Sequence, residues 1–259
     1  MACITSKTKK RTMAVADRAL SLLLVLGLWQ SLTFFFSPLV VPAIKSVCQS
    51  LYEICSTPAL YSMILITLFR LLAGLFVGVL GGVILGVIMG YSERFRNILS
   101  PMVGILQTVP PVAWVVLALV WFGFNGKPAV FIVVTATIPV ISISVSEGIR
   151  NVDPGLLEMA YLYRFSERKK MFHVVFPSVM SYFNSSFKVA LGLAWKIVVM
   201  GEVLTTSDGI GGMIKDARLN VEPETIIAWS IITVALFYLS GYVARFLFSW
   251  KDDGRVTSS

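Results

Sequence analysis

The chain alternates between long apolar segments and short segments that carry most of its charge. A helix that crosses a hydrocarbon layer of about 30 Å needs roughly 20 largely uncharged residues. Six segments meet this requirement, so the pattern predicts an all-α membrane protein with six transmembrane helices. These helices are expected near Ala19–Phe36, Tyr61–Gly90, Met102–Phe122, Ala129–Val145, Val179–Leu204 and Thr225–Phe248.

The composition agrees with this interpretation. Hydrophobic residues make up 56% of the chain and charged residues 14%, with a mean hydropathy of +0.81, whereas soluble domains carry about 25% charged residues. The basic start followed by Ala19–Phe36 also resembles a signal peptide. However, its apolar stretch exceeds the usual length of about 7–15 residues and no A-x-A-like site follows, which favours a retained first helix at residues 19–36.

The positions of Lys and Arg predict the orientation, because short cytoplasmic flanks are enriched in them. With six spans both termini lie on one side, and that side carries fifteen of these cations. The other side carries only Lys45, Lys127, Lys215 and Arg218. The basic N-terminal tail (residues 1–18), a loop (147–178) and the C-terminal tail (249–259) are therefore expected in the cytoplasm. Because the net charge of +8 is dispersed along membrane flanks, nucleic acid is not an expected partner.

Motifs for catalysis and metal binding are missing from the sequence. One histidine cannot supply a His-rich metal site, and neither H-E-x-x-H nor G-x-S-x-G occurs. The only Gly-Lys pair, Gly126-Lys127, is followed by proline, so the chain also lacks the G-x-x-x-x-G-K-[ST] loop that binds ATP. No metal or cofactor is expected, and any ATP must be hydrolysed by another polypeptide. The three cysteines (Cys3, Cys48 and Cys55) are predicted to be free thiols.

The second predicted span carries a glycine at every fourth position: Gly74, Gly78, Gly82, Gly86 and Gly90. Such a row forms a smooth stripe along about 24 Å of helix, which lets another helix approach closely. Tight packing within the subunit is the main interpretation. A stripe on which helices slide during a conformational cycle is the alternative, and the sequence does not separate the two.

Between the first two spans, Pro42–Ile54 has apolar residues at helical spacing. This segment is interpreted as a short helix on the outer interface, with a plain loop as the alternative. Within the third span, Pro110-Pro111 removes two backbone donors. The two prolines indicate either a kink near a transport path or a simple interruption at the end of the span.

Few ionisable residues lie inside the spans, where such groups usually face a cavity or a partner. Lys196 and Glu202 are six residues apart, about 120° around a helix, so they are not expected to pair directly. We expect Glu202 near the outer end of its span, either at the interface or in a path. Arg70 and Lys188 lie near enough to span ends to extend toward water.

The most informative segment is a charged island, Asp153–Pro177, between the fourth and fifth spans. Asp153 is suited to cap a helix whose first residue is Pro154, and Ser166 to cap a second helix at Glu167–Phe172. Pro177 would end the approach to the next span. Leu156, Leu157, Ala160 and Tyr161 would form an apolar face beside Glu158. Two short helices of this kind fit a groove on another protein, although an ordinary cytoplasmic loop has the same pattern.

At this point the residues resemble a known family. Glu158-Met159-Ala160, then Arg164, Val174 and Phe176-Pro177, resemble the E-A-A-x-x-x-G-x(9)-I-x-L-P loop of permease subunits of binding-protein-dependent ABC importers. Further segments are similar to the nitrate, sulfonate and taurine branch, and the resemblance covers about residues 55–248. These segments are Val109–Trp114, Trp121–Gly123, Val152–Pro154, Ala194–Lys196, Gly201-Glu202 and Gly209–Gly211.

The resemblance implies a type I importer fold in a bacterial cytoplasmic membrane. Its expected partners are two ATPase subunits, a second permease subunit and an external solute-binding protein. A homodimer is expected, with a heterodimer left open. The residues expected to couple to the ATPase are Asp153, Pro154, Leu157, Glu158, Ala160, Tyr161, Arg164 and Pro177. Those expected along the path are Pro110, Pro111, Trp114, Lys196 and Glu202.

Two residues depart from the family loop. Met159 replaces the second residue of E-A-A, and Arg164 replaces the glycine. If that glycine is left-handed, arginine there costs about 1–2 kcal/mol, unless the turn is built differently. Lys196 suits an anionic solute, but the branch includes carriers of sulfonates, taurine, nitrate and pyrimidine-type vitamin precursors. The rival hypothesis, a stand-alone ion-coupled transporter, would require paired interrupted helices in repeated halves, which the sequence does not suggest.

Overall fold

The computed structural model describes residues 17, 20–21 and 23–247, and every regular element in that part of the chain is helical. Apart from Asp17, the tails predicted at 1–18 and 249–259 lie outside the described residues. The helices are Leu23–Phe35, α2 (Ile44–Ser56), α3 (Ala59–Tyr91), α4 (Glu93–Thr108), α5 (Pro111–Phe122), α6 (Lys127–Arg150), α7 (Pro154–Leu162), α8 (Glu167–Lys170), the π-helix η1 (Met171–Val175), α9 (Phe176–Thr205), α10 (Gly209–Leu219) and α11 (Pro223–Leu247).

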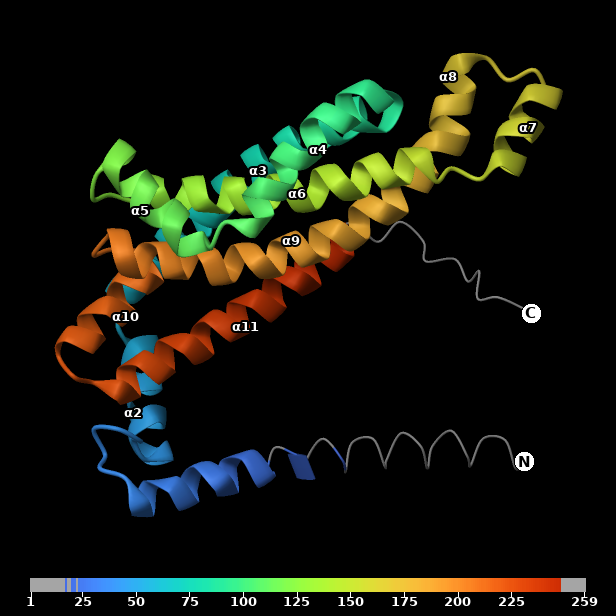
Figure 1. The fold of residues 1–259 in the computed structure, drawn as a ribbon. Coiled ribbons are helices and arrows are strands. Elements are labelled where there is room, and N and C mark those ends of the chain that lie inside the picture. Colours follow the sequence, from blue (N-terminus) through green and yellow to red (C-terminus); the bar gives the residue numbers. More distant parts are fainter. Residues whose placement is uncertain (1–16, 18–19, 22, 248–259) are drawn as a thin grey trace, which may run out of the picture.

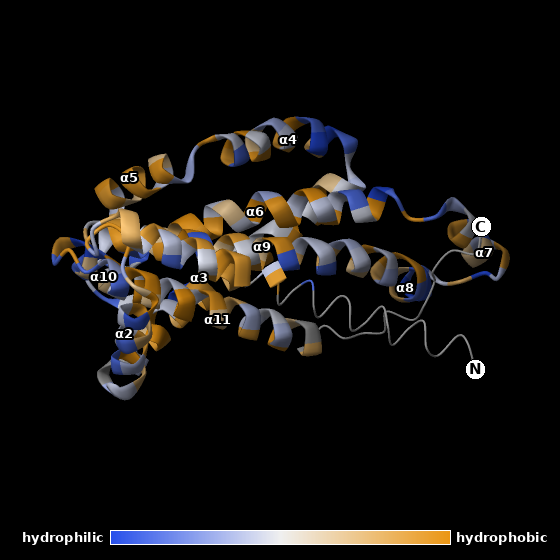
Figure 2. Cartoon of the chain, turned by 90° about the horizontal axis from the view of Figure 1, so that it is seen from below, coloured by the Kyte–Doolittle hydropathy of each residue, from blue (hydrophilic) through white to orange (hydrophobic). Residues whose placement is uncertain are grey.

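The long helices form an elongated bundle with different short helices at its two ends (Figure 1). Helix α6 packs between α3 and α9, and α11 contacts α9, α10 and α2. Helices α7 and α8 project from one end, while α2 and α10 lie at the other. Figure 2 shows hydrophilic residues gathered near α8 and near α10, with hydrophobic residues along the long helices between them.

Three helices in the described residues are long and apolar enough to cross a membrane: Tyr61–Tyr91, Lys127–Arg150 and Pro223–Ala244. They contain most of the second, fourth and sixth predicted spans. Helix α9 contains the whole fifth span but is not among the three; it carries polar and charged residues between its apolar ones, among them Lys188, Lys196 and Glu202. In the first predicted span, the apolar helix Leu23–Phe35 is shorter than a bilayer crossing requires.

The third predicted span, Met102–Phe122, is not one continuous helix. Helices α4 and α5 meet at an angle of 95°. The break follows from the two prolines, since Pro110 disfavours helical geometry at Val109, which has ψ 126°, and Pro111 then starts α5. Gly123 ends α5 with φ 73°. The prediction of a single span is therefore met only if the bent pair crosses the membrane as one unit.

The segment after the first helix is the helix α2 rather than a plain loop. It begins at Ile44 and ends at Ser56, close to the predicted Pro42–Ile54. Its Val47 and Ile54 side chains are buried, and α2 packs against α11. Cys48 and Cys55 on this helix are free thiols.

The glycine row of α3 lies directly against α6. A Cβ atom on Gly74 would come within 2.7 Å of the Val133 Cβ, and one on Gly90 within 2.8 Å of the Ile149 Cβ. The glycines between them, Gly78, Gly82 and Gly86, similarly face Thr137, Ile141 and Val145. Both rows advance by four residues in the same direction, so α3 and α6 run parallel. The absence of side chains on one helix is what allows this approach.

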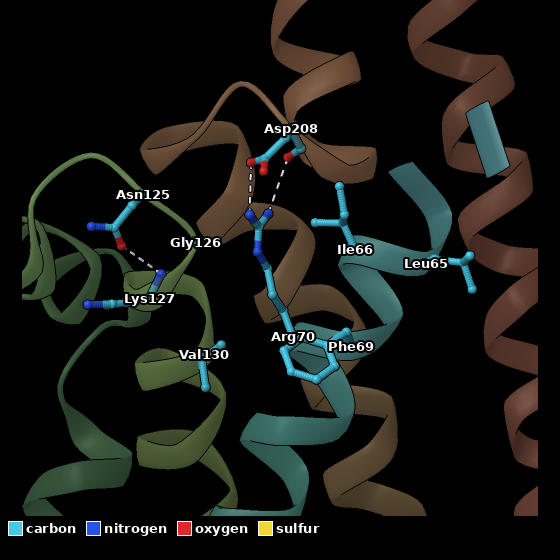
Figure 3. Close-up of a pocket in the computed structure, with 9 residues that line it drawn as sticks. All are labelled: Leu65, Ile66, Phe69, Arg70, Asn125, Gly126, Lys127, Val130 and Asp208. Carbon is cyan, nitrogen blue, oxygen red and sulfur yellow. Dashed lines mark hydrogen bonds and ion pairs between the residues drawn. The ribbon is translucent and has the colours of Figure 1, made fainter. Parts of the chain in front are cut away.

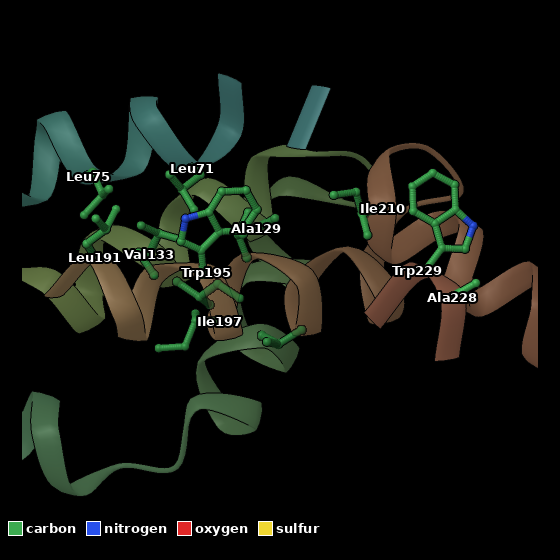
Figure 4. Packing of buried hydrophobic residues seen from close by; sticks show 14 of the residues in the cluster. Leu71, Leu75, Ala129, Val133, Leu191, Trp195, Ile197, Ile210, Ala228 and Trp229 are labelled. Atoms are coloured by element: carbon green, nitrogen blue, oxygen red, sulfur yellow. The ribbon is translucent and has the colours of Figure 1, made fainter. Parts of the chain in front are cut away.

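The main hydrophobic core lies where α3, α6 and α9 meet (Figure 4). Trp195 of α9 is 2% exposed and packs among Leu71, Ala129 and Val133. Its indole Nε1 donates to the Ser240 hydroxyl of α11 over 2.9 Å, which satisfies its polar atom. The core thus fixes α9 between α6 and α11, with its two ends free to carry other structures.

Candidate functional site

The island between α6 and α9 begins with a capped helix, α7. The Asp153 side chain accepts a hydrogen bond from the Gly155 N–H over 2.8 Å, and Pro154 occupies the first turn. These are the features expected of a helix start, because the first N–H groups have no partner within the helix. Sequence reasoning predicted this helix start.

The C-terminus of α7 is closed by a left-handed arginine. Arg164 has φ 52°, and its N–H donates to the Tyr161 carbonyl while the Phe165 N–H donates to that of Ala160. This is the Schellman arrangement, which glycine usually completes. Of the two alternatives for Arg164, the structure therefore has the left-handed turn, with the associated cost of about 1–2 kcal/mol.

One face of helix α7 packs against its own subunit, and the other is exposed. Ala160 is 3% exposed and packs in a small cluster with Val152, Val174 and Val175. On the other side, Tyr161 is 85% exposed, Leu162 77% and Tyr163 72%. We call Tyr161, Leu162 and Tyr163 the apolar knob. Sequence reasoning selected Tyr161 but missed Leu162 and Tyr163, which lie beyond the E-A-A motif; their apolar character beside Arg164 was the available signal.

The remaining residues of the predicted coupling set occupy different positions. Glu158 is exposed, Leu157 is half-buried, and Pro177 lies in the first turn of α9. Pro177 therefore does not end the approach to the span but lies inside the helix start. The second helix is also shorter than predicted: after Ser166 caps α8 at the Lys169 N–H, the chain passes through η1 directly into α9.

At the opposite end of the bundle, three charged residues form an ion network. Arg70 Nη1 is 2.8 Å from Glu202 Oε1, and Arg70 Nη2 is 2.8 Å from Asp208 Oδ1 (Figure 3 shows the contact with Asp208). Arg70 comes from α3, Glu202 from α9, and Asp208 from the turn before α10. Glu202 is fully buried and the Arg70 side chain is 10% exposed. A buried carboxylate of this kind requires a cationic partner.

The same carboxylate also holds the start of α10. Glu202 Oε2 accepts from the Gly211 N–H over 3.0 Å and from the Thr67 hydroxyl over 2.8 Å, while the Thr67 hydroxyl accepts from the Ile210 N–H. The first amides of α10, which no helical carbonyl can satisfy, thus have partners on α3 and α9. Gly211 has no room for a side chain, since a Cβ there would lie 2.4 Å from that of Glu202.

The ionisable residues of the spans therefore divide into buried ones, Arg70 and Glu202, and exposed ones such as Lys196. The expectation that Arg70 extends toward water is wrong, because its guanidinium is buried in this network. Lys196 and Glu202 do not pair with each other, as predicted from their angular separation: Glu202 is buried and Lys196 is exposed. The sequence signal for the network was modest, namely that Arg70 and Glu202 are opposite charges inside predicted spans.

The prolines predicted to lie along the path are at the α4–α5 break, and both are exposed. Trp114 follows one turn later and is half-buried, with its ring 6.4 Å from that of Phe131 in an edge-on arrangement. Its indole N–H has no hydrogen-bond partner in the described residues. The two prolines and Trp114 lie within four positions of one another at the start of α5, while Lys196 lies on α9.

The described part of the chain is therefore of the all-helical, membrane-embedded class, with three helices long and apolar enough to span a membrane. Comparison with protein families identifies the group within that class. Residues 78–254 match the model of the "binding-protein-dependent transport system inner membrane component", and the chain belongs to this family.

Individual relatives and solved structures agree with this family. The chain is 30% identical over 225 residues to the putative aliphatic sulfonates transport permease protein SsuC of Escherichia coli, which covers 86% of each chain. It is 32% identical over 198 residues to the nitrate import permease protein NrtB of Synechococcus elongatus, covering 75% of this chain and 69% of that protein. Its fold resembles a chain of the inward-facing MetNI methionine ABC transporter, with a TM-score of 0.63, 14% identity, and coverage of 74% and 97%.

Proposed function

We propose that this chain is the membrane-spanning subunit of an ATP-driven importer and that α7 is its docking helix for a cytoplasmic ATPase. The observation that carries the proposal is the apolar knob. Tyr161, Leu162 and Tyr163 are exposed on a short capped helix outside the apolar spans, next to a turn held by Arg164. Tyrosine side chains are frequent anchors of protein interfaces, and a short helix with an exposed apolar surface is suited to a groove on another protein. ATP would be bound and hydrolysed there, not on this chain.

The proposed topology has six spans, with α4 and α5 together forming the third and α9 the fifth. Both termini and α7 would then be cytoplasmic. The distribution of cations along the bundle supports this orientation. Arg96 and Arg150 lie at the end that carries α7 and α8, where both pair with Glu93, at 3.8 and 3.2 Å. Lys45 and Lys215 belong to α2 and α10 at the other end.

The proposed assembly contains two permease subunits, two ATPases and an external solute-binding protein. Lys196 supports a second subunit or a water-filled path. It lies within α9, is exposed in the single chain, and has no ion-pair partner among the described residues. A lysine inside a span does not face lipid without substantial cost, so this face of α9 would line a path or meet a partner. We propose a homodimer in which Lys196 faces that path, with Pro110, Pro111 and Trp114 also beside it.

A small anion is the proposed solute. The named relatives are permeases for aliphatic sulfonates and nitrate, and others are named for taurine and bicarbonate. Lys196 would lower the electrostatic cost of an anion in the path. Selection among anions would reside mainly in the external binding protein, which delivers the solute.

The test is co-purification of the tagged chain with a candidate ATPase subunit, in nanodiscs, followed by measurement of ATP hydrolysis with and without the binding protein. We expect a stoichiometric complex whose hydrolysis is stimulated. Leu162→Glu should abolish ATPase association because it places a charge in the docking groove. Leu219→Glu is the matched control: Leu219 is 64% exposed at the end of α10, at the opposite end of the bundle, and should leave association unchanged.

Ala160 is unsuitable for this test, because a large residue there would disrupt the cluster with Val174 and Val175. If Leu162→Glu binds the ATPase as well as Leu219→Glu does, then α7 is not the docking helix. A parent chain that binds no ATPase, and transports its solute in response to an ion gradient instead, would return the function to stand-alone ion-coupled transport.

A further inference from the structure

A hollow of about 650 Å³ opens between α3 and α6 at the end of the bundle opposite α7 (Figure 3). Three parts of the chain form it: residues 65–70 of α3, the start of α6 with the turn before it, and the turn before α10. The residues that line it are Leu65, Ile66, Phe69, Arg70, Asn125, Gly126, Lys127, Val130 and Asp208. None of the residues that line this hollow belongs to the docking helix or to the proposed path.

The walls of the hollow are apolar and face outward. Leu65 is 63% exposed and Phe69 73%, and both belong to α3, a helix long and apolar enough to span the membrane. Val130 of α6 lines the wall from the other helix. Side chains of this kind at the end of a span face lipid, so the walls match a hydrocarbon chain better than a polar solute.

The rim of the hollow is charged and polar. Arg70 reaches it but is already bound by Glu202 and Asp208. Asp208 has a side chain that remains 46% exposed. Lys127 is exposed at the first residue of α6 and has no ion-pair partner among the described residues. Arg70 and Lys127 balance the charges of Asp208 and the buried Glu202. Of these four groups, Lys127 offers an accessible positive charge and Asp208 an accessible negative charge.

Asp208 stays ionised at neutral pH. Its partial burial opposes ionisation, but hydrogen bonds from Thr206 and Arg70 and the charge of Arg70 outweigh that effect and lower the pKa of the Asp208 carboxyl. Figure 3 shows Asp208 at the Arg70 guanidinium and Lys127 on a neighbouring element with its side chain extending away from Arg70, both above the apolar side chains of Phe69 and Val130. A ligand that matches this rim must therefore carry both an anionic and a cationic hydrogen-bonding group.

We propose that this hollow binds a phospholipid with a phosphoethanolamine headgroup. One acyl chain would lie along Leu65, Phe69 and Val130, the phosphate would bind the Lys127 ammonium, and the primary ammonium of the headgroup would donate to the Asp208 carboxylate. Basic pockets between membrane helices are one recognised kind of lipid headgroup site, and the rim here adds a carboxylate to the basic group. A choline headgroup has no N–H to donate, and a glycerol headgroup carries no cation that could add a second partner to the Arg70 contact of Asp208.

The test uses the full chain purified in detergent and placed in nanodiscs with equal amounts of phosphatidylethanolamine, phosphatidylcholine and phosphatidylglycerol. Lipid retained on the protein is then counted by native mass spectrometry. We expect phosphatidylethanolamine to be enriched about tenfold, as one additional charge-assisted contact predicts. Lys127→Gln should remove most of this enrichment. Lys45→Gln, an exposed lysine at the start of α2, is the matched control and should retain it.

A second variant separates the two headgroup contacts. Asp208→Asn should lower the preference for phosphatidylethanolamine over phosphatidylcholine while leaving phosphate binding at Lys127, so total lipid retention should change less than in Lys127→Gln. Equal retention of all three lipids by the parent chain would overturn the proposal. So would an unchanged preference in Lys127→Gln. None of these outcomes depends on ATPase association, so failure here is distinct from failure of the proposed function.

Discussion

Two short helices, α7 and α10, end in the same way but are attached to the molecule differently. Each is closed by a non-glycine residue with positive φ, Arg164 at 52° and Val221 at 60°, and each has the Schellman pair of hydrogen bonds. Only Ala160 of α7 is buried. Five residues of α10 are buried, and its first turn is held by Glu202 and Thr67 from two other helices.

The difference indicates what each end of the molecule is built to do. A helix whose first amides and glycines are enclosed by α3 and α9 behaves as part of the bundle, and its cap contributes to global stability. A helix that makes few contacts and exposes Tyr161, Leu162 and Tyr163 is available to another protein. Damage at the α10 end should therefore unfold the chain, whereas damage at the α7 end should affect association.

The largest expected effect comes from removing the cation of the ion network. Arg70→Met leaves the fully buried Glu202 carboxylate without its partner, which should cost about 3–5 kcal/mol of stability. Glu202→Gln should cost less, because Arg70 still pairs with Asp208. The measurement is the unfolding midpoint of each variant in the same detergent.

The double variant Arg70→Met/Glu202→Gln tests the cause. Because the buried charge is then absent, the double variant should be more stable than Arg70→Met alone. If Arg70→Met has the unfolding midpoint of the parent, the network does not hold α10, and the contrast between the two helices loses its physical basis.

The next effect concerns the close approach of α3 to α6, within the part of the bundle to which α10 but not α7 is attached. In Gly82→Ala the added Cβ would lie 2.7 Å from the Ile141 Cβ, whereas in Gly81→Ala it would lie 3.5 Å from the end of Ile138. We expect Gly82→Ala to cost about 1–3 kcal/mol through overpacking and Gly81→Ala to be nearly neutral. Equal unfolding midpoints for the two variants would contradict tight packing and favour a stripe on which the helices slide.

Features that depend on nearby residues were predictable from the sequence. The Asp153-Pro154 helix start, the glycine row and the long apolar helices all follow from local composition or a fixed spacing, and the ordered motifs indicated the family. The position of the proline break was also visible at Pro110-Pro111. The 95° angle was not, because it depends on how α5 packs against α6.

The sequence did not predict features that depend on contacts between residues far apart along the chain. Arg70 and Glu202 are separated by 132 residues, so no local pattern indicates that they meet. The sequence places both residues inside predicted spans, but it predicts that Arg70 extends toward water, because the partner that buries its guanidinium comes from a distant helix. Likewise, Ala160 and Tyr161 were assigned to one face of α7, although packing against Val174 and Val175 turns Ala160 inward.

The smallest effect tests the two caps directly. Glycine at a left-handed position relieves about 1–2 kcal/mol of strain but adds backbone entropy to the unfolded chain, so the net gain should be below about 1 kcal/mol. Val221→Gly should raise the unfolding midpoint, because α10 is part of the bundle and a β-branched residue is strained at φ 60°. Arg164→Gly should leave the midpoint unchanged and slow proteolysis within residues 153–166, because α7 opens independently.

Matched controls for this last comparison are the residues just before each cap. Asn220 has φ −81° and Tyr163 has φ −79°, so glycine at either position relieves no strain and should give no gain. If Arg164→Gly raises the unfolding midpoint as much as Val221→Gly does, then α7 is coupled to the bundle as firmly as α10. The exposed knob would then be part of a rigid unit, and a protein that binds it would move α9 directly through η1 rather than through a loosely attached helix.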